Sequence, residues 1–238
     1  MKKILISSSI AAVVMAASSA HAVLIDFTGG TVHFHGGGTA TTDTTANFDD
    51  ADYYEEGGML FDFISGGASS FATHVGDYYG VGNDVIHGHW DAGPFGDLDL
   101  IRVEKIGGGM FDLNYLKVTT NTSTGGGPAS GTEEVYLNAL ADGVNVSHSI
   151  LLPPDDWGFG GPNSEIFLGP EFDGIKAFTI TNGANSTAVG IGLDEFFIDE
   201  PGPPNPNAVP EAGHSLTLLG LALSGLFFGR RALRRQAT

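Results

Sequence analysis

Histidines alternate with single residues at two places in the chain, His33-x-His35 and His87-x-His89. Residues two apart on a β-strand point to the same face, so each pair presents two imidazoles side by side. Paired imidazoles are ligands for transition metals such as zinc and copper. The pairs would form one site if they met across a sheet; otherwise they are polar, outward-facing positions on half-exposed strands.

Aspartates near both ends of the central region are candidate ligands for Ca²⁺. Asp26 lies near its start, and Asp194 and Asp199 lie near its end. Calcium takes about six to eight oxygen ligands, and the glycine-rich turns beside these carboxylates offer backbone carbonyls. If the terminal strands lie close together, we expect Asp26, Asp194 and Asp199 to form a structural calcium site.

Three aromatic residues lie in stretches rich in Gly, Asp and Pro: Trp90, Trp157 and Phe159. Exposed aromatic rings in such loops could stack on the faces of sugar rings, so these three are the candidate glycan-binding residues. The alternative is that the rings close the ends of the fold, because aromatic side chains contribute strongly to burial.

The chain contains no Gly-x-Ser-x-Gly, His-Glu-x-x-His or P-loop motif, and it has no cysteine. We therefore expect a protein that is not an enzyme. The alternative is a secreted carbohydrate-active enzyme, a glycoside hydrolase or lyase, because a glycosidase needs only two suitably spaced carboxylates. The 28 acidic residues leave that alternative open.

Composition predicts the fold that must position these residues. The 238 residues include 36 Gly and 16 Phe, a composition that favours short strands separated by turns. We expect an all-β chain with a single jelly-roll or galactose-binding-like β-sandwich. The net charge of −18 argues against nucleic-acid binding and leaves cations and neutral glycans as partners.

Apolar alternation and turn residues place some of the strands. Met59, Phe61 and Phe63 are predicted to point to one side of a strand. The Gly- and Thr-rich stretch 36–45 has no apolar periodicity and predicts an exposed loop. Asp-Gly and Asn-Gly pairs are typical of tight turns and predict two hairpins. These hairpins span 134–151 and 175–198.

The N-terminal segment has the order of parts found in a secretory signal peptide. Two lysines precede an apolar stretch, 4–17, and Ala20-His21-Ala22 supplies the small residues Ala20 and Ala22 of a cleavage site. We predict export through the Sec translocon and removal of residues 1–22 by signal peptidase. A permanent N-terminal membrane anchor is the alternative.

The C-terminal segment also has three parts: a short motif, an apolar stretch and a basic end. The apolar stretch, 212–229, has about the minimum length that crosses a bilayer as a helix. The arginines that follow it favour a cytoplasmic C-terminus. The motif residues are Val209, Pro210, Glu211, Ala212 and Gly213, and the arginines are Arg230, Arg231, Arg234 and Arg235.

This tail resembles the PEP-CTERM sorting tail of bacterial exported proteins, which an exosortase-type membrane protease processes. Val209, Pro210 and Glu211 match the motif, Ala212 replaces its usual proline, and Gly213 is similar to the related Val-Pro-Asp-Ser-Gly type. The resemblance implies cleavage near Glu211. An ordinary C-terminal anchor is the alternative.

The sequence and the resemblance together predict a signal peptide, 1–22, a β-sandwich, 23–200, a proline-rich linker, 201–208, and a sorting tail, 209–238. They imply export across the inner membrane as a membrane-anchored precursor and release to the cell surface or an exopolysaccharide matrix. Short segments such as Gly192–Ile198 also resemble the β-sandwich domains common among PEP-CTERM proteins. The predicted role is structural or glycan-binding.

Overall fold

The computed structural model describes part of the chain, which forms two antiparallel sheets and one short 3-10 turn. The described residues are 22–66, 68–69, 73–78, 80, 82, 84–91, 96–123, 134–141, 144–151, 164–183 and 188–206. The chain divides into two compact units, Met1–Gly202 and Pro203–Thr238. The predicted signal peptide except Ala22, and the predicted tail, lie outside the described residues. Within the described residues, no helix is long and apolar enough to cross a membrane.

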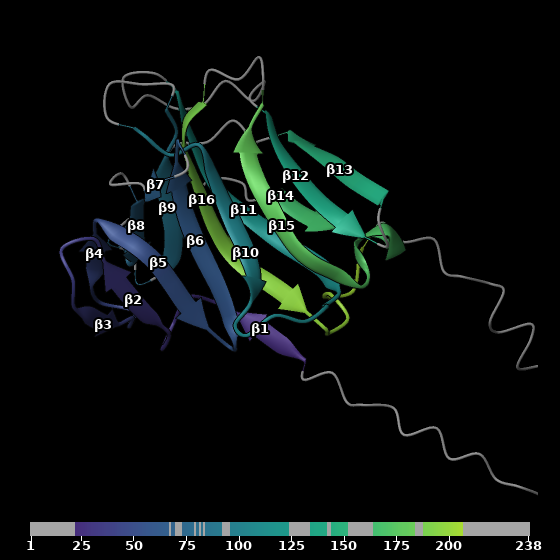
Figure 1. Cartoon of the computed structure of the whole chain (residues 1–238), viewed down its shortest axis with the longest axis horizontal. Coiled ribbons are helices and arrows are strands. Elements are labelled where there is room, and N and C mark those ends of the chain that lie inside the picture. The colour runs from purple at the N-terminus through teal and green to yellow at the C-terminus, as the bar shows by residue number, and fades with distance from the viewer. Residues whose placement is uncertain are drawn as a thin grey trace, which may run out of the picture. The chain divides into compact units, whose positions relative to one another are not determined.

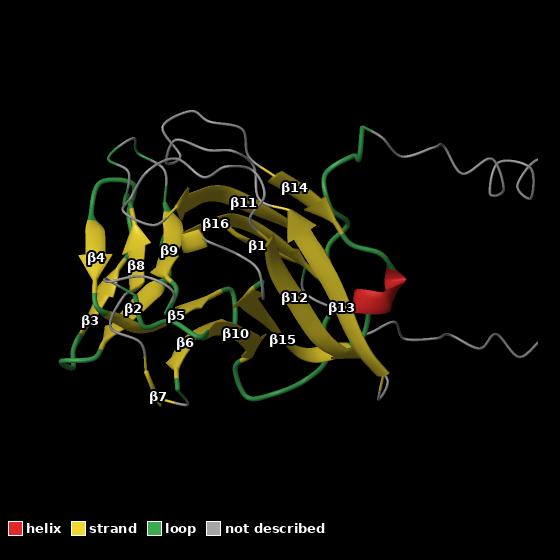
Figure 2. Ribbon diagram, turned by 90° about the horizontal axis from the view of Figure 1, so that it is seen from above, coloured by secondary structure: helices red, strands yellow, loops and turns green. Residues whose placement is uncertain are grey.

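The sheet that we call sheet A has the strand order β14-β11-β16-β9-β8-β4, and β1 also pairs with β16. Figures 1 and 2 show it as one layer of the fold. Its strands are β1 (Val23–Ile25), β4 (Asn47–Asp49), β8 (Thr73–Gly76), β9 (Val85–His89), β11 (Leu113–Ser123), β14 (Ser164–Phe167) and β16 (Ala188–Ile198).

The second layer, sheet B, has the order β13-β12-β15-β10-β6-β5-β2-β3, and β7 pairs with β6. The 3-10 turn η1 (Pro170–Phe172) precedes β15. The strands are β2 (Thr31–Phe34), β3 (Thr39–Thr41), β5 (Ala51–Glu56), β6 (Met59–Ser65), β7 (Ala68–Ser69), β10 (Leu100–Lys105), β12 (Glu134–Ala141), β13 (Val144–Leu151) and β15 (Ile175–Asn182). The all-β sandwich prediction is confirmed.

Aromatic rings from both sheets meet in the core. The Phe61 ring of β6 lies 5.4 Å from the Phe196 ring of β16 and 5.4 Å from the Phe27 ring, measured between centroids. Met59, Phe61 and Phe63 are all buried, which confirms the predicted alternation on this strand. Because the pleat sends every second residue inward, the residues between them form the outer face of sheet B.

The two predicted hairpins have different outcomes. β12 and β13 pair along their length from Glu134↔Leu151 to Ala141↔Val144, which confirms the first. The second prediction is wrong, because β15 belongs to sheet B and β16 to sheet A. An Asn-Gly pair reports only a local turn tendency, whereas β15 is held between β10 and β12. The predicted loop 36–45 is corrected as well, since β3 pairs with β2.

Candidate functional site

The outer face of sheet B carries a row of polar residues that crosses the sheet from β2 to β13. Asp62 faces outward on β6 because Phe61 and Phe63 on either side are buried, and Arg102 does so on β10 between Ile101 and Val103. Strand register places one polar residue opposite the next. The row consists of His33, Tyr53, Asp62, Arg102, Thr179, Asn138 and Ser147.

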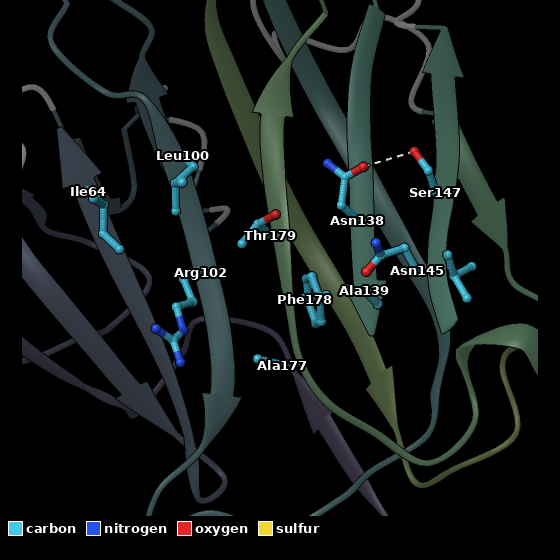
Figure 3. Close-up of a pocket in the computed structure, with 11 residues that line it drawn as sticks. Ile64, Leu100, Arg102, Asn138, Ala139, Asn145, Ser147, Ala177, Phe178 and Thr179 are labelled. Carbon is cyan, nitrogen blue, oxygen red and sulfur yellow. Dashed lines mark hydrogen bonds between the residues drawn. The ribbon is translucent and has the colours of Figure 1, made fainter. Parts of the chain in front are cut away.

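A groove of about 620 Å³ opens over one end of this row. It extends from β6 across β10, β15 and β12 to β13 (Figure 3). Ile64 and Leu100 give it an apolar side, and amide, hydroxyl and guanidinium groups supply the polar side. The polar lining residues are Arg102, Asn138, Asn145, Ser147 and Thr179. We call this feature the sheet B groove.

The polar end of the groove is held by a hydrogen bond between two strands. The Ser147 hydroxyl donates to Oδ1 of Asn138 at 2.8 Å. This bond keeps the Asn138 oxygen on the β13 side, and Figure 3 shows its amide nitrogen directed toward β15 and Thr179. The amide therefore offers its N–H groups to a ligand in the groove. No sequence pattern distinguishes this site, because Asn, Ser and Thr are common at outward strand positions.

Charges of both signs lie at the β10 side of the groove. Nη2 of Arg102 is 2.6 Å from Oε2 of Glu104, and the Arg102 side chain is 48% exposed. Asp62 lies opposite Arg102 in register. Burial, together with the negative charge of Asp52, raises the pKa of Asp62 even though Arg102 acts in the opposite direction. Arg102 is thus paired with Glu104 and acts electrostatically on Asp62.

The two predicted histidine pairs do not meet. His33 lies on sheet B, where its ring stacks on Tyr53 at 4.0 Å, whereas His87 and His89 lie on β9 of sheet A. The partner that sequence reasoning missed is His74 on β8, which lies opposite His87. No local pattern could have linked His74 with a pair that follows it in a later strand.

The three predicted calcium ligands are not brought together as one set. β1 does pair with β16, as that prediction required. However, Nζ of Lys105 donates to Asp199 at 2.6 Å, and Nζ of Lys117 donates to Asp194. Asp26 accepts a hydrogen bond from the backbone of Thr28. As the described side chains are placed, no group of three or more His, Cys, Asp or Glu could hold a metal ion.

Of the aromatic residues predicted to bind glycans, only Trp90 is described. Its side chain is 1% exposed and belongs to the core cluster, so no ring face is available for a sugar. That prediction is corrected, because sequence context at a strand end did not reveal the burial of the ring. Trp157 and Phe159 lie outside the described residues and stay predictions.

Comparisons of the chain with known proteins do not identify a family for it. No family model matches the chain, and no curated protein matches it. One solved structure with some likeness is the isomalto-dextranase of Arthrobacter globiformis T6 complexed with panose. Its identity to this chain is 17%, the TM-score is 0.29, and the match covers 75% of this chain but 32% of the enzyme. A likeness at this level carries no argument about activity.

Proposed function

We propose that this protein is an exported, non-catalytic β-sandwich that binds a neutral polysaccharide in the sheet B groove. The observation that carries the proposal is the lining of the groove, where amide and hydroxyl groups of Asn138, Asn145, Ser147 and Thr179 lie beside apolar Ile64 and Leu100. Sugar units present hydroxyls that both donate and accept hydrogen bonds, next to patches of C–H groups. The polar lining residues can hydrogen-bond with the hydroxyls, and the apolar lining residues can pack against the C–H patches.

The charge of the protein favours a neutral ligand over an anionic one. The formal net charge is −18, and Asp62 and Glu104 both lie beside Arg102, which lines the groove. A polysaccharide rich in carboxylate or sulfate would meet this negative potential as it approached. Arg102 is already paired with Glu104, so its guanidinium is better suited to hydrogen bonding with sugar hydroxyls than to binding an anion.

The predicted signal peptide and the predicted sorting tail support export of the domain to a place where it would meet such a polysaccharide. In this proposal the Sec translocon and signal peptidase act on residues 1–22, and an exosortase-type protease acts on the tail near Pro210 and Glu211. The acidic domain then reaches the cell surface or an exopolysaccharide matrix. Intact mass of the mature protein tests this part: retention of Arg230–Arg235 would make the tail a simple anchor.

Binding is tested with the full chain on an array of neutral and acidic glycans, followed by calorimetric titration with the best oligosaccharide. Ser147→Ala and Asn138→Ala each remove one groove hydrogen-bonding group, so we expect about fivefold weaker binding for each. Ser149→Ala on the same strand is the matched control, because Ser149 does not line the groove. Equal losses in Ser147→Ala and Ser149→Ala, or preferential binding of acidic glycans, would contradict the proposal.

One observation favours a second candidate, a glycan-cleaving enzyme. Asp62 and Glu104 flank Arg102 on the same face, and the raised pKa of Asp62 is a property of general acids in glycosidases. Release of new reducing ends from the bound glycan, abolished in both Asp62→Asn and Glu104→Gln, would establish catalysis and exclude the simple binding role.

A further inference from the structure

Three imidazole rings gather on the outer face of sheet A, a region that the sheet B groove does not include. We call His74, His87 and His89 the histidine cluster. Their ring centroids are separated by 4.7 Å for His87 and His89, 5.5 Å for His74 and His89, and 6.1 Å for His74 and His87. They face outward because Val75 of β8 and Ile86 of β9 point into the core.

The strand pairing gives these histidines the backbone arrangement of a three-ligand metal site. His87 and His89 are two apart on β9, so their side chains leave the same face of the strand. His74 lies directly opposite His87 on the antiparallel neighbour β8. Opposed residues have Cβ atoms about 5 Å apart, so three imidazoles from two adjacent strands can reach one ion. Three histidines and a water form one type of four-coordinate zinc site.

A carboxylate already orients one of the rings. Oδ1 of Asp49, on the edge strand β4, lies 2.7 Å from Nδ1 of His74. Histidines that bind metals commonly donate one ring N–H to a carboxylate, which leaves the other nitrogen as the ligand. A contact of this kind assigns Nε2 of His74 as the nitrogen that would bind the metal. Asp49 would act as a positioning residue.

An aromatic ring stacks on the fully buried member of the histidine cluster. The Tyr78 ring stacks on His87 at 4.1 Å with an interplanar angle of 8°. An imidazole nitrogen binds a metal in the plane of the ring, so a stacked ring covers a face without covering a ligand atom.

The neighbouring strand leaves the flank of the cluster without side chains. Gly192 and Gly190 of β16 lie opposite His87 and His89. Larger residues at these two register positions would project outward beside the rings.

We propose that His74, His87 and His89 bind a transition-metal ion of the zinc and copper class, held between β8 and β9. The described side chains include no group of three that could hold an ion as now placed, so binding requires the rings to rotate about χ1 and χ2. The rings that turn are those of His74 and His89, which are partly exposed, toward the fully buried His87, and the Cα positions set by the strand pairing need not move. The site is independent of the sheet B groove.

The test is calorimetric titration of the full chain with ZnCl₂, supported by the visible spectrum of the Co²⁺ form. We expect one ion per chain, with His74→Ala and His89→Ala each weakening binding more than about 100-fold and abolishing the intense Co²⁺ absorption. Asp49→Asn should weaken binding about tenfold while leaving the stoichiometry intact, as expected for a positioning carboxylate. His33→Ala is the control, because His33 belongs to the other histidine pair and lies on sheet B.

The folded state of each variant is checked by thermal unfolding without metal. Both cluster histidines chosen for substitution are only partly buried, in contrast to His87, which is fully buried. Absence of Zn²⁺ binding to the wild-type chain would overturn the proposal. It would equally fail if the folded His74→Ala and His89→Ala variants bound zinc like wild type, or if His33→Ala lost binding to the same extent.

Discussion

The two outer faces of the sandwich have the same antiparallel pleat but differ in how exposed their polar side chains are. On sheet A, His87 is fully buried under the Tyr78 ring, and Lys117 joins a carboxylate that is 8% exposed. On sheet B, the polar row stays open and Arg102 is 48% exposed. The Lys117–Asp194 contact on sheet A therefore contributes to stability, whereas the polar row on sheet B remains available to a glycan. Substitutions that separate stability from binding test this difference.

Phe196→Ala should produce the largest effect and should affect both faces together. Its ring projects from sheet A, is fully buried and contacts two rings of sheet B, Phe61 at 5.4 Å and Phe178 at 6.0 Å. Loss of a buried Phe side chain costs about 3–5 kcal/mol of unfolding free energy. Chemical denaturation measures this loss. A change below about 1 kcal/mol would mean that the two sheets do not share this core.

Lys117→Ala should destabilise the protein by about 3 kcal/mol, because it leaves a carboxylate with low exposure without its cation. Lys117 donates to Asp194 and, at 3.3 Å, to Glu195. Denaturation of the variant at pH 7 gives the value. A neutral effect would show that sheet A is as tolerant of polar substitutions as sheet B.

The stability of the contact between sheet B and the end of β1 should depend on pH through Glu56. Tyr54 donates to its Oε2 at 2.8 Å, and the backbone N–H of Asp26, next to β1, donates to Oε1 at 3.3 Å. Burial raises the pKa of Glu56 to about 7. The unfolded chain releases this proton near pH 4.5, so unfolding free energy should fall as pH rises from about 4.5 to 7.

We expect Glu56→Gln to remove about 1–2 kcal/mol of that fall, after allowance for the partial exposure of the carboxyl. Denaturation curves at pH 5 and pH 8 compare the two proteins. Part of the fall should remain, since burial also raises the pKa of Asp84, to about 6. Glu171→Gln, at an exposed carboxylate of the 3-10 turn, is the control. An unchanged pH dependence in Glu56→Gln would contradict the assignment.

Arg102→Ala should have the smallest effect on stability, below about 1 kcal/mol, because exposed ion pairs contribute little. Its effect should instead appear as weaker glycan binding, since Arg102 lines the groove. Thermal unfolding and glycan titration of the same preparation separate the two quantities. A loss of stability as large as that of Lys117→Ala would remove the distinction between the faces.

Local patterns in the sequence predicted the features that depend on local physics. The alternation of Met59, Phe61 and Phe63 identified a buried strand face, and an Asp-Gly pair identified the β12–β13 hairpin. The separation of β15 and β16 into different sheets depends on pairing with distant strands. No window around Asn182 contains that information.

The candidate sites depend even more on long-range pairing. His74 joins His87 only because β8 and β9 are neighbours, and Ser147 contacts Asn138 only through the β12–β13 register. The predicted calcium ligands Asp194 and Asp199 are engaged by lysines 77 and 94 residues away along the chain. Residue type indicated the chemistry available, but the sheet register determined which groups meet.

The most direct test of the account is a map of backbone amide chemical shifts during titration with the best neutral oligosaccharide. If the sheet B groove is the binding site, shifts should concentrate in β10, β12, β13 and β15, and amides of β8 and β9 should stay unchanged. Shifts centred on β8 and β9, or an absence of shifts with every neutral glycan, would contradict the proposed function.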